Sequence, residues 1–179
     1  MSLDRSVRWR SLEHGGIEHC HVASSARDTR IRGAIVTPDH GLFYRIKLDQ
    51  TEHMRTVRLE RTDGQVLELF SDGAGNWSDD RAEPLPALRG CIDIDLSASP
   101  LTNSLPIWRC QWIIGQPQRF AMAWIDTDAM TVQRDEQIYT QIDADHFRYQ
   151  AADASFERII SVDDARLVRE YPGLFERLG

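Results

Sequence analysis

Short segments in which apolar and polar residues alternate follow one another along most of the chain. Alternation with a period of two is typical of a β-strand that has one buried face. The clearest segments span residues 17–22, 29–36, 42–48, 54–61, 65–70, 107–114, 119–125, 131–139, 146–150, 156–162 and 167–171. Turn residues separate them, and no long segment keeps a helical period. This pattern predicts a mainly β fold, built as an antiparallel barrel, a sandwich or a strongly curved sheet.

The run of residues 89–109, in the middle of the chain, carries a different combination of signals. Residues 91–96 alternate strictly, so a strand there places three aliphatic side chains on one face and Asp93 and Asp95 on the other. A helix-start signal follows this strand at once. Two carboxylates in such a position distinguish the run from an ordinary surface loop.

The helix signal consists of Ser99, which suits the N-cap position, and Pro100, which suits the first helical position. Pro106 is expected to end this helix, and a further strand is expected to follow it. Leu101 and Leu105 lie four residues apart and therefore share one helix face. We expect this face to cover the apolar concave side of a curved sheet, as a single short helix from about residue 100 to residue 105.

The composition indicates one globular domain that covers residues 1–179. Its 41% hydrophobic and 27% charged residues are ordinary for a soluble protein. The formal net charge is −7, so nucleic acids and anionic membrane surfaces are poor partners for the molecule as a whole. No local run of Lys and Arg residues along the sequence changes that expectation.

Targeting and cofactor signals are absent from the sequence. The first ten residues lack the apolar segment of a signal peptide, and no apolar run reaches the roughly 20 residues that span a bilayer. We therefore expect a cytoplasmic protein without a transmembrane segment. Cys20, Cys91 and Cys110 are odd in number and far apart, which argues against a disulfide framework and a cysteine-rich zinc site.

Other catalytic motifs are also missing. His19 and His21 share a face of their strand, but no recognised metal-binding spacing supports them, and an exposed strand face is the simpler interpretation. The sequence has no nucleophile elbow, no glycine-rich dinucleotide motif and no P-loop. We expect no metal and no cofactor.

Asp93 and Asp95 are the first candidates for chemistry. On one strand face they stand about 7 Å apart. Two carboxylates at that spacing can accept hydrogen bonds from sugar hydroxyls or hold a cation together. They can also act as acid and base, because inverting glycosidases place their pair roughly 6.5–9.5 Å apart. The alternative is a solvated strand face, which is the usual setting of acidic residues.

Polar residues near this pair form the second group of candidates. Thr102 and Asn103 offer neutral donors and acceptors, although hydrogen bonds at the helix end explain them equally well. Arg109 can pair with an aspartate as a structural ion pair, or meet a phosphate or carboxylate of a ligand. Arg55 is a weaker candidate of the same kind.

Aromatic residues crowd the second half of the chain: Trp108, Trp112, Trp124, Tyr139, Phe147 and Tyr149. A ligand with sugar and acyl parts needs polar contacts and an apolar wall, and aromatic side chains supply such a wall. Most of them should simply pack in the core. Tyr139 and Tyr149 are the better candidates for ligand contact because each carries a polar hydroxyl.

Several motifs together resemble a known family. They are G-C-I-D-I-D-L-S-A-S-P-L-T-N-S-L-P-I-W-R at residues 90–109, D-G-A-G-N-W at 72–77, I-Y-T at 138–140, F-R-Y at 147–149 and V-R-E-Y-P-G-L-F-E-R-L at 168–178. Over essentially its whole length the chain resembles the putative glycolipid-binding family, formerly a domain of unknown function. The resemblance implies a large sheet wrapped around a helix, remotely similar to the lipoprotein localisation factors, and a homodimer.

The resemblance also implies an acidic pocket, which we place at Asp93 and Asp95, joined by Glu18. The expected partner is then a glycolipid or another sugar-bearing amphiphile, bound in a role in glycolipid metabolism. A first alternative is a glycolipid-modifying hydrolase that uses Asp93 and Asp95; it requires one buried carboxylate with a raised pKa. A second is a dimeric interaction or scaffold module, which requires no ligand-sized cavity at this face.

Overall fold

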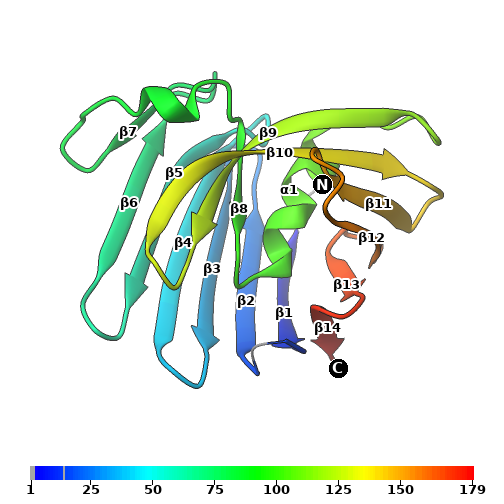
Figure 1. The fold of residues 1–179 in the computed structure, drawn as a ribbon, viewed down its shortest axis with the longest axis horizontal. Helices are drawn as coiled ribbons and strands as arrows, with labels where there is room; N and C mark the ends of the chain where they lie inside the picture. The colour runs from blue at the N-terminus through cyan, green and yellow to red at the C-terminus, as the bar shows by residue number, and fades with distance from the viewer. Residues whose placement is uncertain (1–2, 14) are drawn as a thin grey trace.

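Fourteen strands pair edge to edge into one sheet, as the computed structural model of residues 3–13 and 15–179 shows (Figure 1). The strands are β1 (Asp4–Ser11), β2 (Ile17–Ser24), β3 (Asp28–Val36), β4 (Gly41–Asp49), β5 (Met54–Arg61), β6 (Val66–Ser71), β7 (Trp77–Asp79), β8 (Asp93–Leu96), β9 (Pro117–Asp126), β10 (Thr131–Gln141), β11 (His146–Ala151), β12 (Glu157–Val162), β13 (Val168–Tyr171) and β14 (Phe175–Leu178). The helices are the 3-10 turns η1 (Pro86–Leu88) and η2 (Pro100–Asn103) and the α-helix α1 (Ser104–Arg109).

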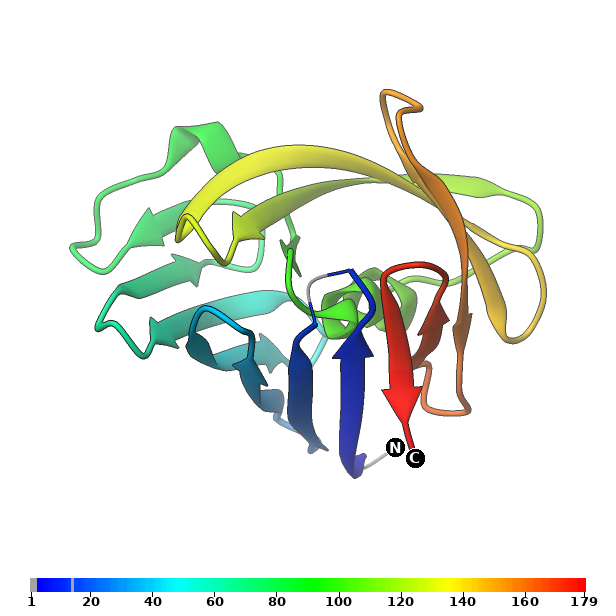
Figure 2. The same cartoon turned by 60° about the horizontal axis from the view of Figure 1, so that its bottom comes forward.

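The order of the strands follows the chain with one exception. β1 pairs with β14, so the first and last strands meet in the middle of the sheet, and β7 and β8 form its two edges. Neighbouring strands are antiparallel except β8 and β9, which are parallel. Each half of the chain therefore forms one half of the sheet, and the first and last strands lie side by side (Figures 1 and 2).

The sheet curls around the helical segment, which lies in its interior (Figure 2). Alternate residues of the first half face inward and form a mainly aliphatic core with β8 and the helix. The second half contributes a separate core that is rich in aromatic side chains. The predicted fold, a large curved and mainly antiparallel sheet around a single short helix, is confirmed.

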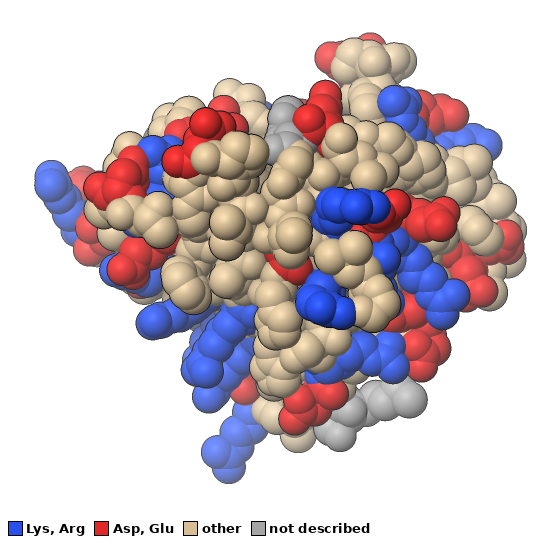
Figure 3. All heavy atoms as spheres, turned by 90° about the horizontal axis from the view of Figure 1, so that it is seen from below, with Lys and Arg blue, Asp and Glu red and all other residues tan. Residues whose placement is uncertain are grey.

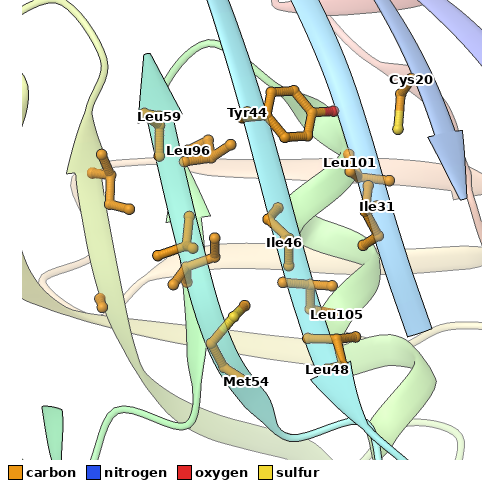
Figure 4. Close-up of a cluster of buried hydrophobic side chains, with 14 of the residues drawn as sticks. Cys20, Ile31, Tyr44, Ile46, Leu48, Met54, Leu59, Leu96, Leu101 and Leu105 are labelled. Carbon is orange, nitrogen blue, oxygen red and sulfur yellow. The ribbon is translucent and has the colours of Figure 1, made fainter. Parts of the chain in front are cut away.

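The helix begins as the sequence predicts. Ser99 is the N-cap in an extended conformation, and its hydroxyl accepts a hydrogen bond of 3.2 Å from the backbone N–H of Leu101. Leu101 and Leu105 are fully buried and point toward Ile31 and Leu48 of the first half of the sheet (Figure 4). Burying two leucines contributes on the order of 4 kcal/mol to folding.

The predicted end of the helix was wrong. Pro106 lies within α1, the helix runs on to Arg109, and the strand predicted over residues 107–114 does not form. The first turn of an α-helix tolerates proline, because the N–H groups of that turn have no intrahelical partner. Ser104 precedes Pro106 by only two positions, so Pro106 falls in this first turn.

Two strands at the chain ends were not predicted. β1 has only Val7 and Trp9 as inward-facing apolar residues between arginines, and β14 lies beyond the last predicted strand, which ends at residue 171. Each pairs with its neighbour along the chain, β2 or β13, and the two strands also pair with each other across the middle of the sheet, a long-range contact that leaves no mark in either segment. No helix among residues 3–13 and 15–179 is long and apolar enough to cross a membrane.

Candidate functional site

A cavity of about 260 Å³ opens inside the curved sheet, beside the beginning of the helical segment. Its polar lining consists of Asp95, Ser97, Ser99 and Asn103. Its apolar lining consists of Leu96, Trp124, Tyr149, Phe156, Tyr171, Leu174 and Phe175. One wall thus comes from the central run of the sequence, and the other comes from the strands of the second half.

Asp95 is the one carboxylate of this lining, and only neutral groups hold it. The Thr102 hydroxyl donates to Oδ1 at 3.0 Å, and the Gln137 amide donates to Oδ2 at 2.7 Å. Thr102 can alternatively donate to the carbonyl of Ser99 at 3.2 Å, and a hydroxyl has one proton to give. Asp95 can therefore exchange this donor for a hydroxyl of a ligand without leaving Thr102 unpaired.

A chain of hydrogen bonds supports Asp95 from behind. The Asn103 amide donates to the Tyr139 hydroxyl at 2.8 Å, and this hydroxyl donates to the Gln137 carbonyl oxygen at 3.3 Å. The Gln137 amide nitrogen then points at Asp95 and also donates to Asp135 at 3.1 Å. Every donor in this chain has an acceptor, so the orientation of the Gln137 side chain toward Asp95 is fixed.

Burial controls the charge of Asp95. The residue keeps some accessible surface because it lines the cavity, but protein surrounds its carboxyl group on the other sides. Desolvation raises the pKa of Asp95 to about 6, and the hydrogen bonds from Gln137 and Thr102 limit that rise. Near neutral pH the carboxylate is charged, forms no ion pair with residues 3–13 or 15–179, and faces the cavity.

Asp93 lies on the same face of β8 but has a different partner. Arg109, at the end of α1, donates to its Oδ2 from Nη2 at 2.6 Å and to its Oδ1 from Nε at 3.3 Å. Asp93 is fully buried. Burial raises the pKa of Asp93, and the guanidinium opposes that rise. Asp93 is not among the residues that line the cavity, so the two aspartates do not share one site.

Glu18 is a third buried acid, located on β2. Its Oε1 accepts hydrogen bonds from Tyr44 and, at 2.7 Å, from the hydroxyl of the N-cap residue Ser99. Its Oε2 is buried without a hydrogen-bond partner. Desolvation raises the pKa of Glu18 to about 7, although both hydroxyl donors lower it. Glu18 lines a small cavity of about 30 Å³ that shares Phe175 with the cavity at Asp95.

Tyr44 reaches Glu18 because a glycine stands opposite it. Gly33 on β3 pairs directly with Tyr44 on β4, and a Cβ atom at Gly33 would lie 2.1 Å from the tyrosine ring. The ring therefore lies over β3 and delivers its hydroxyl to β2. The link from Ser99 through Glu18 to Tyr44 ties the start of the helix to the first half of the sheet.

The aromatic wall is continuous. Tyr139 contacts Tyr149 edge-on with ring centroids 5.3 Å apart, and Tyr149 contacts Phe156 and Tyr171, each at 5.9 Å. Tyr171 in turn lies 6.3 Å from Phe175. Such edge contacts hold the rings in fixed orientations. The cavity therefore has a rigid apolar side opposite the polar side that carries Asp95.

A second cavity of about 320 Å³ adjoins the first and shares Ser97 and Trp124 with it. Asp39, Asp126 and Asp128 belong to its lining, and His40 of the turn after β3 lies 3.5 Å from Asp128 of the turn after β9. Figure 3 views the molecule from this end, and acidic atoms are visible within the mainly uncharged centre of the face. The turns after β3 and β9 thus border an acidic entrance.

The predicted site residues occupy five different settings. Asp95, Asn103 and Tyr149 line the cavity. Thr102 and Tyr139 lie behind this lining and are hydrogen-bonded to Asp95 and Asn103, respectively. Glu18 lines the adjoining small cavity. Asp93 and Arg109 form an ion pair with each other. Arg55 lies elsewhere: it donates to the Asp72 carbonyl and approaches Asp49 at 3.9 Å near the edge of the first half of the sheet.

Sequence reasoning missed several residues around the cavity: Tyr44, Ser99, Gln137, Phe156 and Tyr171. Ser99 was identified only as an N-cap, although its hydroxyl also donates to Glu18. Gln137 sits at an inward position of β10, and a polar residue there is a signal of a buried network. Within residues 3–13 and 15–179, no three His, Cys, Asp or Glu side chains are grouped to hold a metal ion.

Comparisons with known proteins find similarity over nearly the whole chain. The model of a family described as putative glycolipid-binding matches residues 6–177. The structure is similar to the crystal structure of a DUF1089 family protein from Pseudomonas aeruginosa, with a TM-score of 0.79 and 33% sequence identity over 90% of this chain and 92% of that chain. A search of curated proteins found no match.

Proposed function

The chain belongs to the putative glycolipid-binding family, and from this premise we propose that it binds the sugar part of a glycolipid or related amphiphile in the cavity beside Asp95. The observation that carries the proposal is the setting of Asp95: a carboxylate without a cation, on the polar side of a cavity whose opposite side is aromatic. With this binding we also propose a role in glycolipid metabolism.

A sugar ring matches the two sides of this cavity. Its hydroxyls can donate to Asp95 and exchange hydrogen bonds with Asn103 and Ser97, while its apolar face lies against the rings of Tyr149 and Tyr171. A hydrogen bond to a charged acceptor contributes about 1.5–3 kcal/mol, so Asp95 supplies the largest polar contribution.

The size of the cavity limits what enters it. Its 260 Å³ is somewhat below the roughly 300–1,000 Å³ of pockets for drug-sized ligands. One sugar ring fits this volume, whereas an entire glycolipid does not. The remainder of the ligand would extend through the adjoining cavity of about 320 Å³, whose entrance lies between the turns after β3 and β9.

The hydrolase alternative has one observation in its favour, the pKa of about 6 at Asp95. It also needs a second carboxylate that faces the substrate, and Asp93 is bound by Arg109 and does not line the cavity. The interaction module requires no cavity at this face, and Asp95 lines one. Binding is therefore the function that the geometry supports best, and the homodimer stays a prediction for light scattering to test.

Native mass spectrometry and calorimetry with octyl glucoside and octyl galactoside test the proposal. We expect binding at millimolar concentration or below, and at least tenfold weaker binding by Asp95→Asn, since the variant loses the charged acceptor. Asp80→Asn removes the same charge at an exposed position away from the cavity and should bind like the wild type. The proposal fails if neither glycoside binds the folded protein, or if Asp95→Asn binds as tightly as the wild type.

A further inference from the structure

The outer face of the first half of the sheet carries a row of cationic and histidine side chains. His21, Arg32, Arg45 and Arg58 stand directly opposite one another across β2, β3, β4 and β5. Like charges in directly opposite positions destabilise a sheet. The row is therefore not explained by the stability of the fold.

Acidic neighbours neutralise only part of this face. Arg58 pairs with Glu68 at 2.7 Å and Glu60 at 3.5 Å. Arg32 and Arg45 form no ion pair and no hydrogen bond with any other described side chain. These two arginines lie opposite each other in the centre of the row, so the middle of the face keeps an uncompensated positive charge.

This charge is opposite in sign to that of the protein, whose formal net charge is −7. The next row adds Arg30 opposite Lys47, with Asp28 as their shared acidic partner. Figure 3 shows Lys and Arg side chains gathered along the lower left edge of the molecule, on the side where β3 and β4 lie in Figure 2. The cations thus form one face rather than a general basic surface.

A groove of about 530 Å³ runs over the centre of this face. His19, His21, Arg32, Arg45 and Phe43 are among the residues that border it. A groove with two free guanidinium groups is suited to phosphate oxygens, which arginine binds through two parallel hydrogen bonds.

Exposed apolar side chains adjoin the groove at one end. Ile17, Val36 and Phe43 are 52%, 64% and 64% exposed, and Ile17 stands directly opposite Val36. They lie at the same end of the strands as residues 37–39, which border the entrance to the candidate binding site. Cations beside exposed apolar and aromatic residues are the combination that binds bilayer surfaces.

We propose that this outer face of β2–β5 binds the anionic surface of a lipid bilayer. Arg32 and Arg45 would contact lipid phosphates, and Phe43 with Ile17 and Val36 would enter the interface between headgroups and acyl chains. A second copy of the chain is a poorer occupant, because a symmetric contact would place these arginines against their own copies. A free phosphate is also poorer, because it leaves the apolar residues in water.

The acidic residues at the entrance set the orientation of this contact. Asp39, Asp126 and Asp128 disfavour an approach of the entrance itself to an anionic surface. The sheet face binds instead, and the entrance then opens alongside the bilayer, where an amphiphile resides. The bilayer contact goes beyond the proposed sugar binding and does not depend on it, since the cations lie on the opposite side of the sheet from the cavity.

Vesicle co-sedimentation tests the proposal with phosphatidylcholine alone and with phosphatidylcholine and phosphatidylglycerol in equal parts. We expect the wild type to bind only the second kind of vesicle, and high salt to release it. The double variant Arg32→Gln/Arg45→Gln should bind about 30-fold more weakly, as expected for two basic residues near a charged surface. Phe43→Ser should bind about tenfold more weakly.

A matched control removes the same charge from the other half of the sheet. Arg119→Gln/Arg148→Gln alters two exposed arginines on β9 and β11 and should reduce vesicle binding no more than about threefold. Thermal melts by circular dichroism should show that Arg32→Gln/Arg45→Gln folds at least as stably as the wild type, because the repulsion between the two arginines is removed.

Several results would overturn the proposal. The wild type could fail to bind the anionic vesicles at low salt, or both double variants could lose binding equally. Full displacement from the vesicles by millimolar inorganic phosphate would indicate a site for a free anion. The face would instead be assigned to a second copy of the chain if Arg32→Gln/Arg45→Gln differed from the wild type in the mass measured by light scattering but bound vesicles equally well. Sugar binding by Arg32→Gln/Arg45→Gln should equal that of the wild type, so the two proposals can fail separately.

Discussion

Asp93 and Asp95 stand two positions apart on one face of β8, yet their surroundings differ. The carboxylate of Asp93 is fully buried and receives two hydrogen bonds from the guanidinium of Arg109. The carboxylate of Asp95 receives hydrogen bonds from a hydroxyl and an amide and faces a cavity. The same residue type on the same strand thus forms an ion pair at one end and a candidate binding group at the other.

The difference teaches that the partner of a buried acid, more than its position, determines what it can do. An arginine uses both oxygens of Asp93 and neutralises its charge, so little remains for a ligand. Neutral donors leave the charge of Asp95 uncompensated, and Thr102 has a second acceptor in the Ser99 carbonyl. Glu18 follows the second pattern, with Tyr44 and Ser99 as its neutral donors.

Removal of the cation at the Asp93 end should have the largest effect. Arg109→Ala leaves a buried carboxylate without its partner, and we expect the free energy of unfolding to fall by about 3–5 kcal/mol. Urea denaturation followed by circular dichroism measures this loss. The double variant Asp93→Leu/Arg109→Met removes both charges and should recover much of the stability. If Arg109→Ala lowered the free energy of unfolding by less than about 1 kcal/mol, the ion pair would contribute little to the fold.

Glu18 should make stability depend on pH in a defined window. In the unfolded chain its pKa is close to the ordinary 4.5, and in the folded protein it is about 7. Between these values the unfolded state has lost the proton that the folded state keeps, so the free energy of unfolding falls as pH rises. The full contribution, about 3 kcal/mol, is present below pH 4.5 and is lost above about pH 7.

Glu18→Gln keeps an oxygen for Tyr44 and Ser99 but cannot ionise. The stability of this variant relative to the wild type should therefore increase by about 3 kcal/mol from pH 4 to pH 8. Urea denaturation of both proteins at several pH values gives the difference directly and cancels the titration of all other groups. A difference that stays constant across this range would show that Glu18 has an ordinary pKa in the folded protein.

The smallest effect is expected in the network behind Asp95. Tyr139→Phe removes the hydroxyl that joins Asn103 to Gln137, and we expect a loss of about 1–2 kcal/mol because two buried amides lose a partner. Tyr149→Phe is the matched control, since its hydroxyl has no hydrogen bond to a described residue, and it should change stability by less than about 0.5 kcal/mol. Equal losses in both variants would contradict the network.

Local signals explain which parts of the fold could be predicted. Alternation located β2–β6 and β9–β13, because a strand with one buried face needs an apolar residue at every second position. Ser99 and Pro100 located the start of the helix, since capping depends on neighbouring backbone groups. Asp95 and Asn103 lie close to that start in the sequence and were also predicted as site residues, and both line the cavity. Their role in binding stays a prediction.

The end of the helix and the pairing of β1 with β14 could not be predicted in this way. Pro106 lies in the first turn of α1 only because the preceding turn has 3-10 geometry, which delays the start of the α-helix. β1 and β14 are weak strands by themselves and are separated by nearly the whole chain. Each pairs on one side with its neighbour along the chain, β2 or β13, and on the other side with the strand from the opposite end of the chain.

The sequence by itself determined most of the strands, the turns between them and the beginning of the helix, because these depend on residues within a few positions of one another. Only the tertiary structure decided that Arg109 pairs with Asp93 and that Asp95 receives neutral donors from Thr102 and Gln137. It also brought together the cationic face, whose arginines occupy alternate positions on separate strands and form no run along the chain. The physical reason is common to both cases: charge interactions act through space, and strand pairing sets which charges become neighbours.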